Sequence, residues 1–274
     1  MGALELFLAT VGLFITSVIG KPVVRDYRRK RLRAKPFPTE WEQILERGVP
    51  LYRRLADPLK QQLRGHLQVF LAEKRFYGCG GLEITDEMRV TIAVQACLLL
   101  LNRKTDYYPK LFSILVYPSV FVVQRETRDE AGVHTEKRNV LSGESWEAGK
   151  VILAWEEVRY GAQDRTDGEN VVLHEFAHQL DQEDGAANGA PLLGSQSAYF
   201  NWARVLSQAY EELRRDLERG EETVINPQGA ENPGEFFAAA TEAFFEIPEQ
   251  MKATYPELYQ ELSRYYRVDP GQWF

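Results

Sequence analysis

The chain has 274 residues, of which 44% are hydrophobic and 27% charged, an ordinary composition for a globular protein with a full core. It contains two cysteines, which excludes a disulfide framework and is typical of a reducing compartment. The net charge of −7 is unevenly distributed, because residues 1–35 carry eight Lys/Arg and two acidic residues, while the remainder carries a net charge of −13. An acidic body argues against nucleic acid as the partner.

Residues 2–20 form an apolar run with a single charged side chain, Glu5, and the run is just long enough to cross a bilayer. Basic residues follow the run, whereas a signal peptide would carry them before it. We therefore expect a transmembrane helix over residues 1–20 and a basic juxtamembrane linker over 21–37, with the body on the cytoplasmic side of the inner (cytoplasmic) membrane. The alternative is a buried or interfacial N-terminal helix, because the run is short.

The body of the protein is expected to form one domain over residues 38–274, beginning at the prolines that end the basic segment. Apolar residues at helical spacing predict helices over 39–46, 58–74, 88–101, 197–218 and 256–266. β-Branched residues predict strands within 114–123 and over 151–155, so strands and helices together indicate an α+β fold. The strand over 151–155 is either a plain core strand or one that holds an extended peptide by main-chain pairing.

The most informative stretch holds His174 and His178, four residues apart, with Glu175 beside the first. On a helix this spacing brings both imidazoles to one face, one turn apart, where they can share a metal ion. We expect the helix to follow an N-cap at Asp167 and to stop at Gly185. Burying two imidazoles and a carboxylate without an ion would be costly, which favours a metal site over a chance motif. The pattern is typical of a zinc hydrolase, in which the metal lowers the pKa of a water towards ~7 and Glu175 takes its proton.

Two histidines leave a zinc site one protein ligand short. The candidates for the third ligand are Asp181, Glu183, Asp184, Glu235, Glu242 and Glu246. Asp181 shares a face with His178 but is too near in sequence to reach the ion easily. We therefore expect Asp181 to support a metal-binding side chain rather than to bind the metal itself. Glu235 and Glu242 are seven apart on one face of a second apolar helix, and spacing alone does not separate them. Glu235 could instead close a capping box after Asn232.

The motif His174–Asp181 (HEFAHQLD), together with Asn232–Phe237 (NPGEFF), resembles the Mlc titration factor A family of zinc peptidases. That family is in turn similar to the catalytic core of anthrax lethal factor. Further similar stretches are 78–101, 116–123 and 142–146, so the resemblance covers most of residues 38–270.

The resemblance implies a zincin-like metallopeptidase domain of the gluzincin type, mostly helical with a small mixed sheet, with Zn²⁺ as its cofactor. In the family the third ligand is the glutamate of the Pro-x-Glu-x-Phe segment, which is Glu235 here, beside His174 and His178. Glu242 is then expected to support a ligand histidine. Glu175 is expected to be the general base.

One departure from the family concerns catalysis. The family has a tyrosine seven residues before the third ligand, thought to help polarise the substrate carbonyl, and this position is Gln228 here. We expect a bacterial-type, membrane-anchored zinc metallopeptidase that acts on peptides or proteins. The alternatives are a zinc-containing regulatory protein that sequesters a partner such as a transcriptional repressor, and a metal-dependent hydrolase of other substrates.

Overall fold

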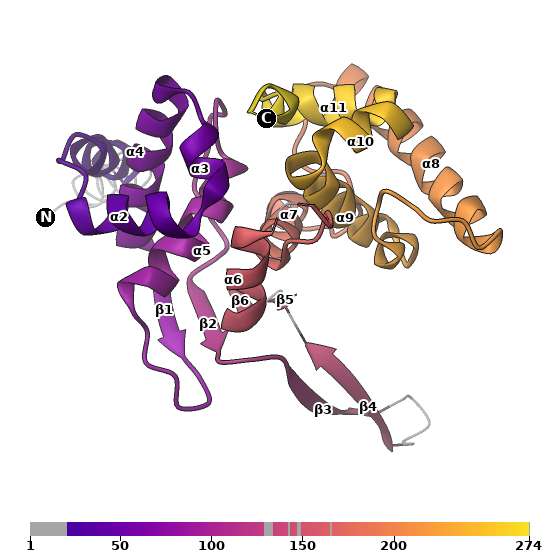
Figure 1. Ribbon diagram of the computed structural model, residues 1–274, viewed down its shortest axis with the longest axis horizontal. Helices are drawn as coiled ribbons and strands as arrows, with labels where there is room; N and C mark the ends of the chain where they lie inside the picture. The colour runs from indigo at the N-terminus through magenta and orange to yellow at the C-terminus, as the bar shows by residue number, and fades with distance from the viewer. Residues whose placement is uncertain (1–20, 129–133, 142, 147–148, 165, 274) are drawn as a thin grey trace, which may run out of the picture.

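The computed structural model describes residues 21–273 except 129–133, 142, 147–148 and 165 (Figure 1). Helices predominate in this range, and residues 21–33 are also helical. The α-helices include α2 (Thr39–Gly48), α3 (Pro50–Arg54), α4 (Asp57–Glu73), α5 (Asp86–Leu98), α6 (Trp155–Gln163), α7 (Val171–Asp181), α8 (Gln196–Glu218), α9 (Pro233–Glu246), α10 (Pro248–Thr254) and α11 (Pro256–Tyr266). The 3₁₀ helices include η1 (Gln182–Asp184), η2 (Pro227–Ala230) and η3 (Pro270–Trp273). The helices predicted from apolar spacing correspond to α2, α4, α5, α8 and α11.

A small sheet lies at the centre of the molecule, with strand order β1-β2-β6-β5. Its strands are β1 (Arg75–Gly78), β2 (Ser113–Tyr117), β5 (Gly143–Trp146) and β6 (Lys150–Ala154). The pairs β1–β2 and β2–β6 are parallel and β5–β6 is antiparallel, so the expected small mixed sheet is confirmed. Val116 of β2 lies opposite Leu153 of β6, and both are fully buried, as the β-branched and apolar pattern predicts.

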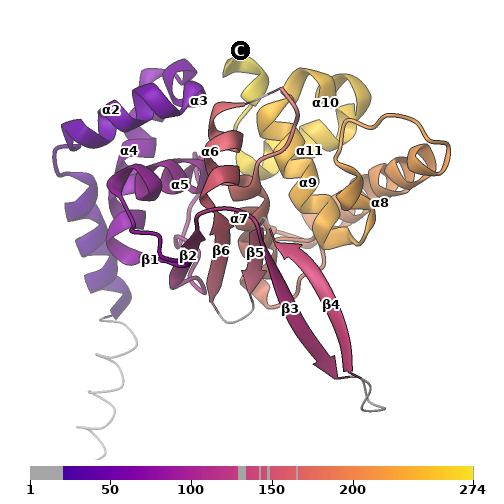
Figure 2. The same ribbon diagram turned by 60° about the horizontal axis from the view of Figure 1, so that its bottom comes forward.

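The strand predicted over 151–155 is an interior strand, because β6 pairs with β2 on one side and with β5 on the other. A peptide therefore cannot add to β6, and that interpretation of the strand was wrong. The edge of the sheet on this side is β5. A separate hairpin of β3 (Phe121–Arg128) and β4 (His134–Leu141) projects from the body (Figures 1 and 2).

The basic N-terminal segment is fastened to the domain, whereas we expected residues 21–37 to act as a linker. Arg29 is buried, and its guanidinium donates to Glu73 at 2.8 Å and to Asp106 at 2.5 Å. No helix among the described residues is long and apolar enough to span a membrane. The span predicted over residues 1–20 lies outside the described residues.

A second contact of this N-terminal helix reaches a buried histidine. Arg33 donates to the hydroxyl of Tyr107 at 2.7 Å, and the same hydroxyl lies 2.9 Å from Nδ1 of His66. Because the hydroxyl accepts from Arg33, its own proton is directed at Nδ1 of His66, which favours a neutral imidazole. Burial and the charge of Arg33 lower the pKa of His66 to about 4.

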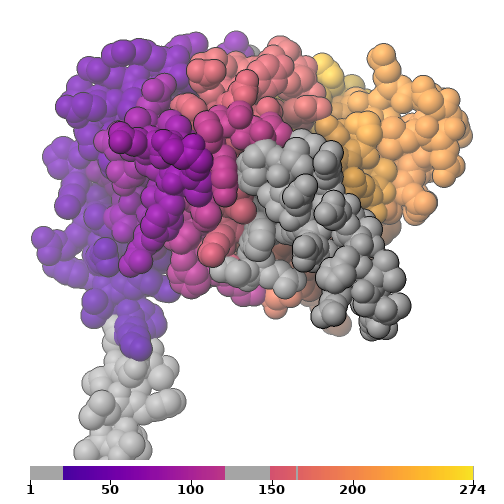
Figure 3. Space-filling view, turned by 90° about the horizontal axis from the view of Figure 1, so that it is seen from below, coloured from indigo at the N-terminus to yellow at the C-terminus, as the bar shows by residue number. Residues whose placement is uncertain are grey.

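Helix α7 lies between the two halves of the molecule and contacts the sheet, α5, α6 and α9 (Figure 2). Phe176 of α7 packs against Phe70 and Tyr108 of the N-terminal half, at ring-centroid distances of 5.7 and 4.9 Å. On the other side, Phe237 of α9 packs against Trp202 of α8 at 5.6 Å. The N-terminal helices and α8 consequently lie on opposite sides of the middle third of the chain (Figure 3). Buried aromatic residues thus fix α7 against the N-terminal half and α9 against α8.

Candidate metal centre

Asn170 begins the helix that carries both histidines. Its side-chain oxygen accepts from the backbone N–H groups of Val172 and Leu173 at 3.1 and 3.0 Å, which makes it the N-cap of α7. The predicted cap, Asp167, is wrong, since its carboxylate accepts from the N–H of Glu169 in the preceding turn. The sequence analysis missed Asn170, although an asparagine immediately before an apolar periodic stretch is a known start signal.

Asn170 also joins several elements around the centre. Its side-chain amide donates to Gln95 of α5 at 2.7 Å, to the carbonyl of Gly161 in α6 at 3.0 Å, and to Glu246 of α9 at 2.9 Å. Its backbone N–H donates to Glu242 at 2.5 Å. Since Asn170 is 3% exposed, these bonds form a buried network that sets the position of α7 relative to its neighbours.

The structure brings His174, His178 and Glu235 together as one group that could hold a metal ion, with ligand atoms all within 4.8 Å of one another. Nε2 of His174 lies 3.2 Å from Nε2 of His178. The Glu235 carboxylate completes the group, at 3.1 Å from Nε2 of His174 and 3.3 Å from Nε2 of His178. The histidines come from α7 and the glutamate from the first turn of α9, so the packing of two helices forms the group.

Glu242 lies behind His174, on the side away from Glu235. Its Oε1 is 2.6 Å from Nδ1 of His174, and its Oε2 accepts from the N–H of Asn170. An ionised carboxylate only accepts, so Nδ1 of His174 carries the proton and donates to Glu242. In the neutral imidazole Nε2 is then left with its lone pair, the form that binds a metal. This contact agrees with the expected supporting role of Glu242.

The charges in the group favour a protonated histidine beside ionised carboxylates. Burial lowers the pKa of His174, but the neighbouring Glu242 and Glu235 outweigh burial and hold that pKa well above its ordinary value. Burial raises the pKa of Glu235, while its hydrogen bonds to His174 and His178 lower it more, so the pKa lies well below its usual range. A metal ion binding here must therefore displace a proton.

Glu175 lines the cavity that adjoins the metal-binding group. This cavity has a volume of about 120 Å³, and His174, Glu242 and Gln228 also line it. Glu175 is 4% exposed, so little of its side chain is in contact with bulk solvent, and the cavity that it lines is mainly polar. The geometry places a carboxylate beside the candidate metal group without making it a member of that group.

Gln228 contacts the third member of the group directly. Its side-chain N–H donates to Oε2 of Glu235 at 3.0 Å, and its backbone N–H donates to the side-chain oxygen of Asn226, the N-cap of η2, at 2.9 Å. Gln228 itself is exposed at the mouth of the cavity. The residue that replaces the family tyrosine therefore orients Glu235.

The other carboxylates considered as ligands lie outside the group. Among the described residues, the one set that could hold a metal contains neither Asp181 nor Glu242. Asp181 is fully buried, and its Oδ2 accepts from the N–H of Gly189 at 2.8 Å. The carbonyl of Gly189 in turn accepts from the indole of Trp202 at 2.8 Å. Asp181 thus ties the loop after α7 to the end of the helix.

Comparison with other sequences relates nearly the whole body of the chain to a family of metallopeptidases. Residues 24–267 match the family described as "Glucose-regulated metallo-peptidase M90". The chain is 42% identical over 257 residues to an uncharacterized protein of Synechocystis sp., covering 93% of this chain and 94% of that protein. It is 31% identical over 236 residues to Mlc titration factor A of Yersinia pestis and of Yersinia pseudotuberculosis, covering 84% of this chain and 85% of those proteins.

Proposed function

The chain belongs to the M90 family of glucose-regulated metallopeptidases, the family of Mlc titration factor A, and we propose that it is a zinc-dependent peptidase. The observation that carries the proposal is the convergence of His174, His178 and Glu235 beside a cavity lined by Glu175. Two imidazoles and one carboxylate are the protein ligands of many catalytic zinc sites, which keep a fourth position open.

The spacing of the three ligand atoms supports zinc. Tetrahedral zinc with bonds of ~2.0–2.1 Å sets its ligand atoms about 3.3–3.4 Å apart. The corresponding separations here are 3.2 Å between Nε2 of His174 and Nε2 of His178, 3.1 Å from Nε2 of His174 to Oε2 of Glu235, and 3.3 Å from Nε2 of His178 to Oε1 of Glu235. The donor set and the close approach of its atoms therefore support this ion.

Zinc held there would act as a Lewis acid towards the scissile carbonyl and would lower the pKa of a water towards ~7. Glu175 accepts the proton of the attacking water and passes it to the leaving amine, a role worth typically ~10²–10⁴-fold in rate. Glu242 holds His174 in the ligating tautomer, and Gln228 holds Glu235 in place. The edge strand β5 packs against α7, the helix that carries both histidines, so an extended substrate can pair with the main chain of β5.

A second candidate function is sequestration of a regulatory protein, and one observation favours it. Gln228 stands where the family has its tyrosine, and its side-chain N–H is already directed at Glu235. A site without a strong donor for the substrate carbonyl would turn over slowly. The relatives named Mlc titration factor A take their name from Mlc, so a transcriptional repressor is the class of partner we propose for this alternative.

Metal content and hydrolysis together test the proposal. We expect the purified full-length chain to bind one zinc ion and to cleave peptides, to lose this activity with a chelator, and to regain it when zinc is added. His174→Ala and His178→Ala should each abolish stoichiometric zinc, because two remaining protein ligands hold it poorly. Asp184→Asn, outside the metal group, is the matched control and should keep its zinc.

Full zinc occupancy in either histidine variant would contradict the metal assignment. Zinc-loaded wild-type protein that cleaves esters but no peptide would favour a different hydrolase. Zinc-loaded protein that cleaves neither would favour the sequestering protein.

We also propose that the protein is anchored in the inner (cytoplasmic) membrane with its body in the cytoplasm. The apolar run over residues 2–20, with basic residues after it, supports this orientation. Protease added to the periplasmic side should leave the body intact. Digestion of the body from that side would contradict the orientation.

A further inference from the structure

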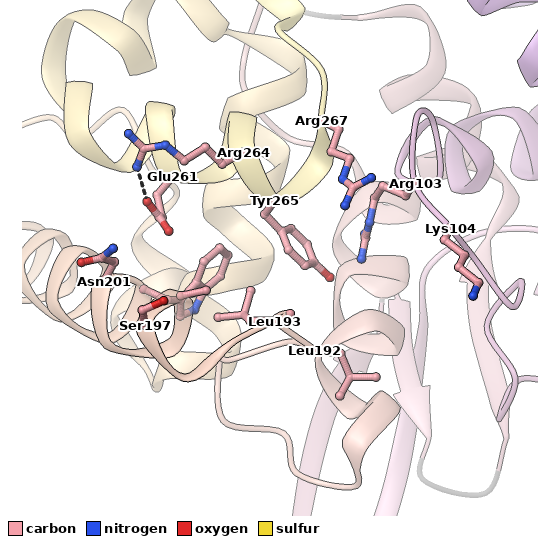
Figure 4. A pocket seen from close by; sticks show the side chains of 13 residues that line it. Arg103, Lys104, Leu192, Leu193, Ser197, Asn201, Glu261, Arg264, Tyr265 and Arg267 are labelled. Atoms are coloured by element: carbon pink, nitrogen blue, oxygen red, sulfur yellow. Dashed lines mark hydrogen bonds and ion pairs between the residues drawn. The ribbon is translucent and has the colours of Figure 1, made fainter.

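A second cavity lies away from the metal centre and has a different chemical character. Its volume is about 620 Å³, and the start of α8, the end of α11 and the turn after α5 form its walls (Figure 4). None of its lining residues lines the cavity beside the metal group. Four basic side chains, Arg103, Lys104, Arg264 and Arg267, face a single acidic one, Glu261.

Most of this positive charge is not neutralised by the lining. Arg264 forms an ion pair with Glu261 at 2.6 Å. Among the described residues no ion pair joins Arg103, Lys104 or Arg267 to a carboxylate. One acidic residue outside the lining, Glu183, is near enough for the charge of Arg103 to act against the burial that raises the pKa of Glu183. Outside residues 1–35 the chain carries a net charge of −13, so a cationic cavity is an exception on an acidic body. Like charges gathered in a concave site attract and concentrate anions.

One of these cations, Arg103, is held in place before any ligand binds. The guanidinium of Arg103 lies over the ring of Tyr265 at 4.1 Å, and it also donates to the carbonyl of Leu99 at 3.3 Å. The side chain of Asn102 donates to the carbonyl of Arg267 at 3.0 Å, which joins the turn to the end of α11.

The backbone at this junction is strained. Asn102 has φ +55° and Arg267 has φ +57°, a region that residues other than glycine rarely adopt. Figure 4 shows the side chains of Arg103, Arg267 and Tyr265, which all line the cavity. Cations that line one cavity repel one another, and an anion bound between them would relieve this repulsion.

We propose that this cavity binds a phosphate group carried by a small molecule or by a lipid. Arginine forks match the oxygens of a phosphate in bidentate geometry, and Lys104 adds a further charge. The first turn of α8 borders the cavity at Ser197, so the positive end of the helix dipole adds to the attraction. A volume of about 620 Å³ lies within the range of small-molecule sites, and Leu192 and Trp202 offer an apolar wall to the rest of the ligand.

Two sources of the phosphate group have to be distinguished. Arg103 and Lys104 also border a neighbouring cavity of about 410 Å³ that is lined by Lys30 and Arg33 of the N-terminal helix. The basic surface is therefore continuous between the phosphate cavity and this helix, which suits a phospholipid headgroup. A soluble phosphorylated metabolite would use the same contacts.

Binding of inorganic phosphate to the full-length chain in non-ionic detergent micelles tests the proposal. We expect saturable binding and a rise in Tm that sodium chloride at equal ionic strength does not produce. Arg267→Gln keeps the backbone carbonyl that Asn102 uses, and it should weaken phosphate binding ~10-fold or more, the effect of one charge-assisted contact. Lys104→Gln should weaken it in the same direction. Arg219→Gln, at the other end of α8 and roughly 33 Å from Ser197, is the matched control and should bind as wild type.

Mixed micelles identify the source of the phosphate group. If phosphatidylglycerol in the micelles competes with inorganic phosphate while phosphatidylcholine does not, the ligand is an anionic headgroup. If phosphate binds equally in both kinds of micelle, the ligand is a soluble phosphate ester. The proposal is overturned if inorganic phosphate does not bind saturably, if chloride produces the same rise in Tm, or if Arg267→Gln binds as tightly as wild type.

Discussion

The contact between Glu242 and His174 offers a sharp test of how the metal centre is held. Glu242 is 6% exposed and uses one oxygen on Nδ1 of His174 at 2.6 Å and the other on the N–H of Asn170 at 2.5 Å. Glu242→Gln preserves the shape but has only one accepting oxygen. Its amide nitrogen must therefore face one of the two donors, and the negative charge beside the imidazole is lost.

We expect zinc affinity to fall by ~10–100-fold, the usual effect of removing a partner that orients a ligand histidine. This corresponds to about 1.4–2.8 kcal/mol of binding free energy. Removal of a third of the ligand set, as in Glu235→Ala, should weaken zinc much further, because a direct bond to the metal is lost. The order of the two effects distinguishes a supporting contact from a ligand.

Competition with a chromophoric chelator measures both variants. The matched control is Glu246→Gln, one turn further along α9, whose wild-type carboxylate accepts from the side chain of Asn170 at 2.9 Å and does not belong to the metal group. Glu246→Gln should keep wild-type zinc affinity. The reasoning is refuted if Glu242→Gln binds zinc as tightly as wild type, or if Glu246→Gln loses as much affinity as Glu242→Gln.

Three further predictions concern stability and turnover. Folding lowers the pKa of His66 from 6.5 to about 4, so between these pH values the unfolded chain binds a proton that the folded chain does not. The free energy of unfolding should therefore fall by up to about 3 kcal/mol from pH 6.5 to pH 4. Denaturant unfolding should show this loss in wild type and not in His66→Gln. Gly189 has φ +75°, and an added Cβ would lie 2.3 Å from the carbonyl oxygen of Pro233. Gly189→Ala should therefore lower the free energy of unfolding by at least ~2 kcal/mol. The control Gly194→Ala, whose added Cβ would meet nothing within 4 Å, should leave the free energy of unfolding nearly unchanged. Gln228→Tyr restores the family hydroxyl and should raise kcat for peptides by up to ~10²-fold, and an unchanged kcat would show that carbonyl polarisation does not limit turnover.

The sequence predicted the half of the metal centre that lies on one helix. The spacing of His174 and His178 fixes their common face, and no tertiary information is needed to see it. The third ligand could not be found in the same way, because Glu235 and Glu242 lie seven apart on one face of α9. Both in fact contact His174, Glu235 at Nε2 and Glu242 at Nδ1. Which carboxylate meets which nitrogen depends on how α9 crosses α7, and only the family resemblance separated them beforehand.

Other features depend on contacts between distant segments. Asn170 joins α7 to α5, α6 and α9 through hydrogen bonds of its side chain, and no local sequence pattern reveals these partners. The strand β1 was not predicted because its four residues are mostly exposed and show no alternation. The second cavity, for which we propose phosphate binding, is lined by Arg103 and Arg267, which are more than 160 residues apart in the sequence. These basic side chains come together only in the folded chain.

The central claim is that Glu175 serves a zinc-dependent hydrolysis as its general base, and kcat of Glu175→Gln measured on zinc-loaded protein tests it most directly. Glutamine keeps the shape and Glu175 is not a member of the metal group, so zinc content and unfolding should match wild type. The account predicts that kcat for peptide cleavage falls by ~10²–10⁴-fold. A zinc-loaded Glu175→Gln variant that cleaves peptides at the wild-type rate would contradict it.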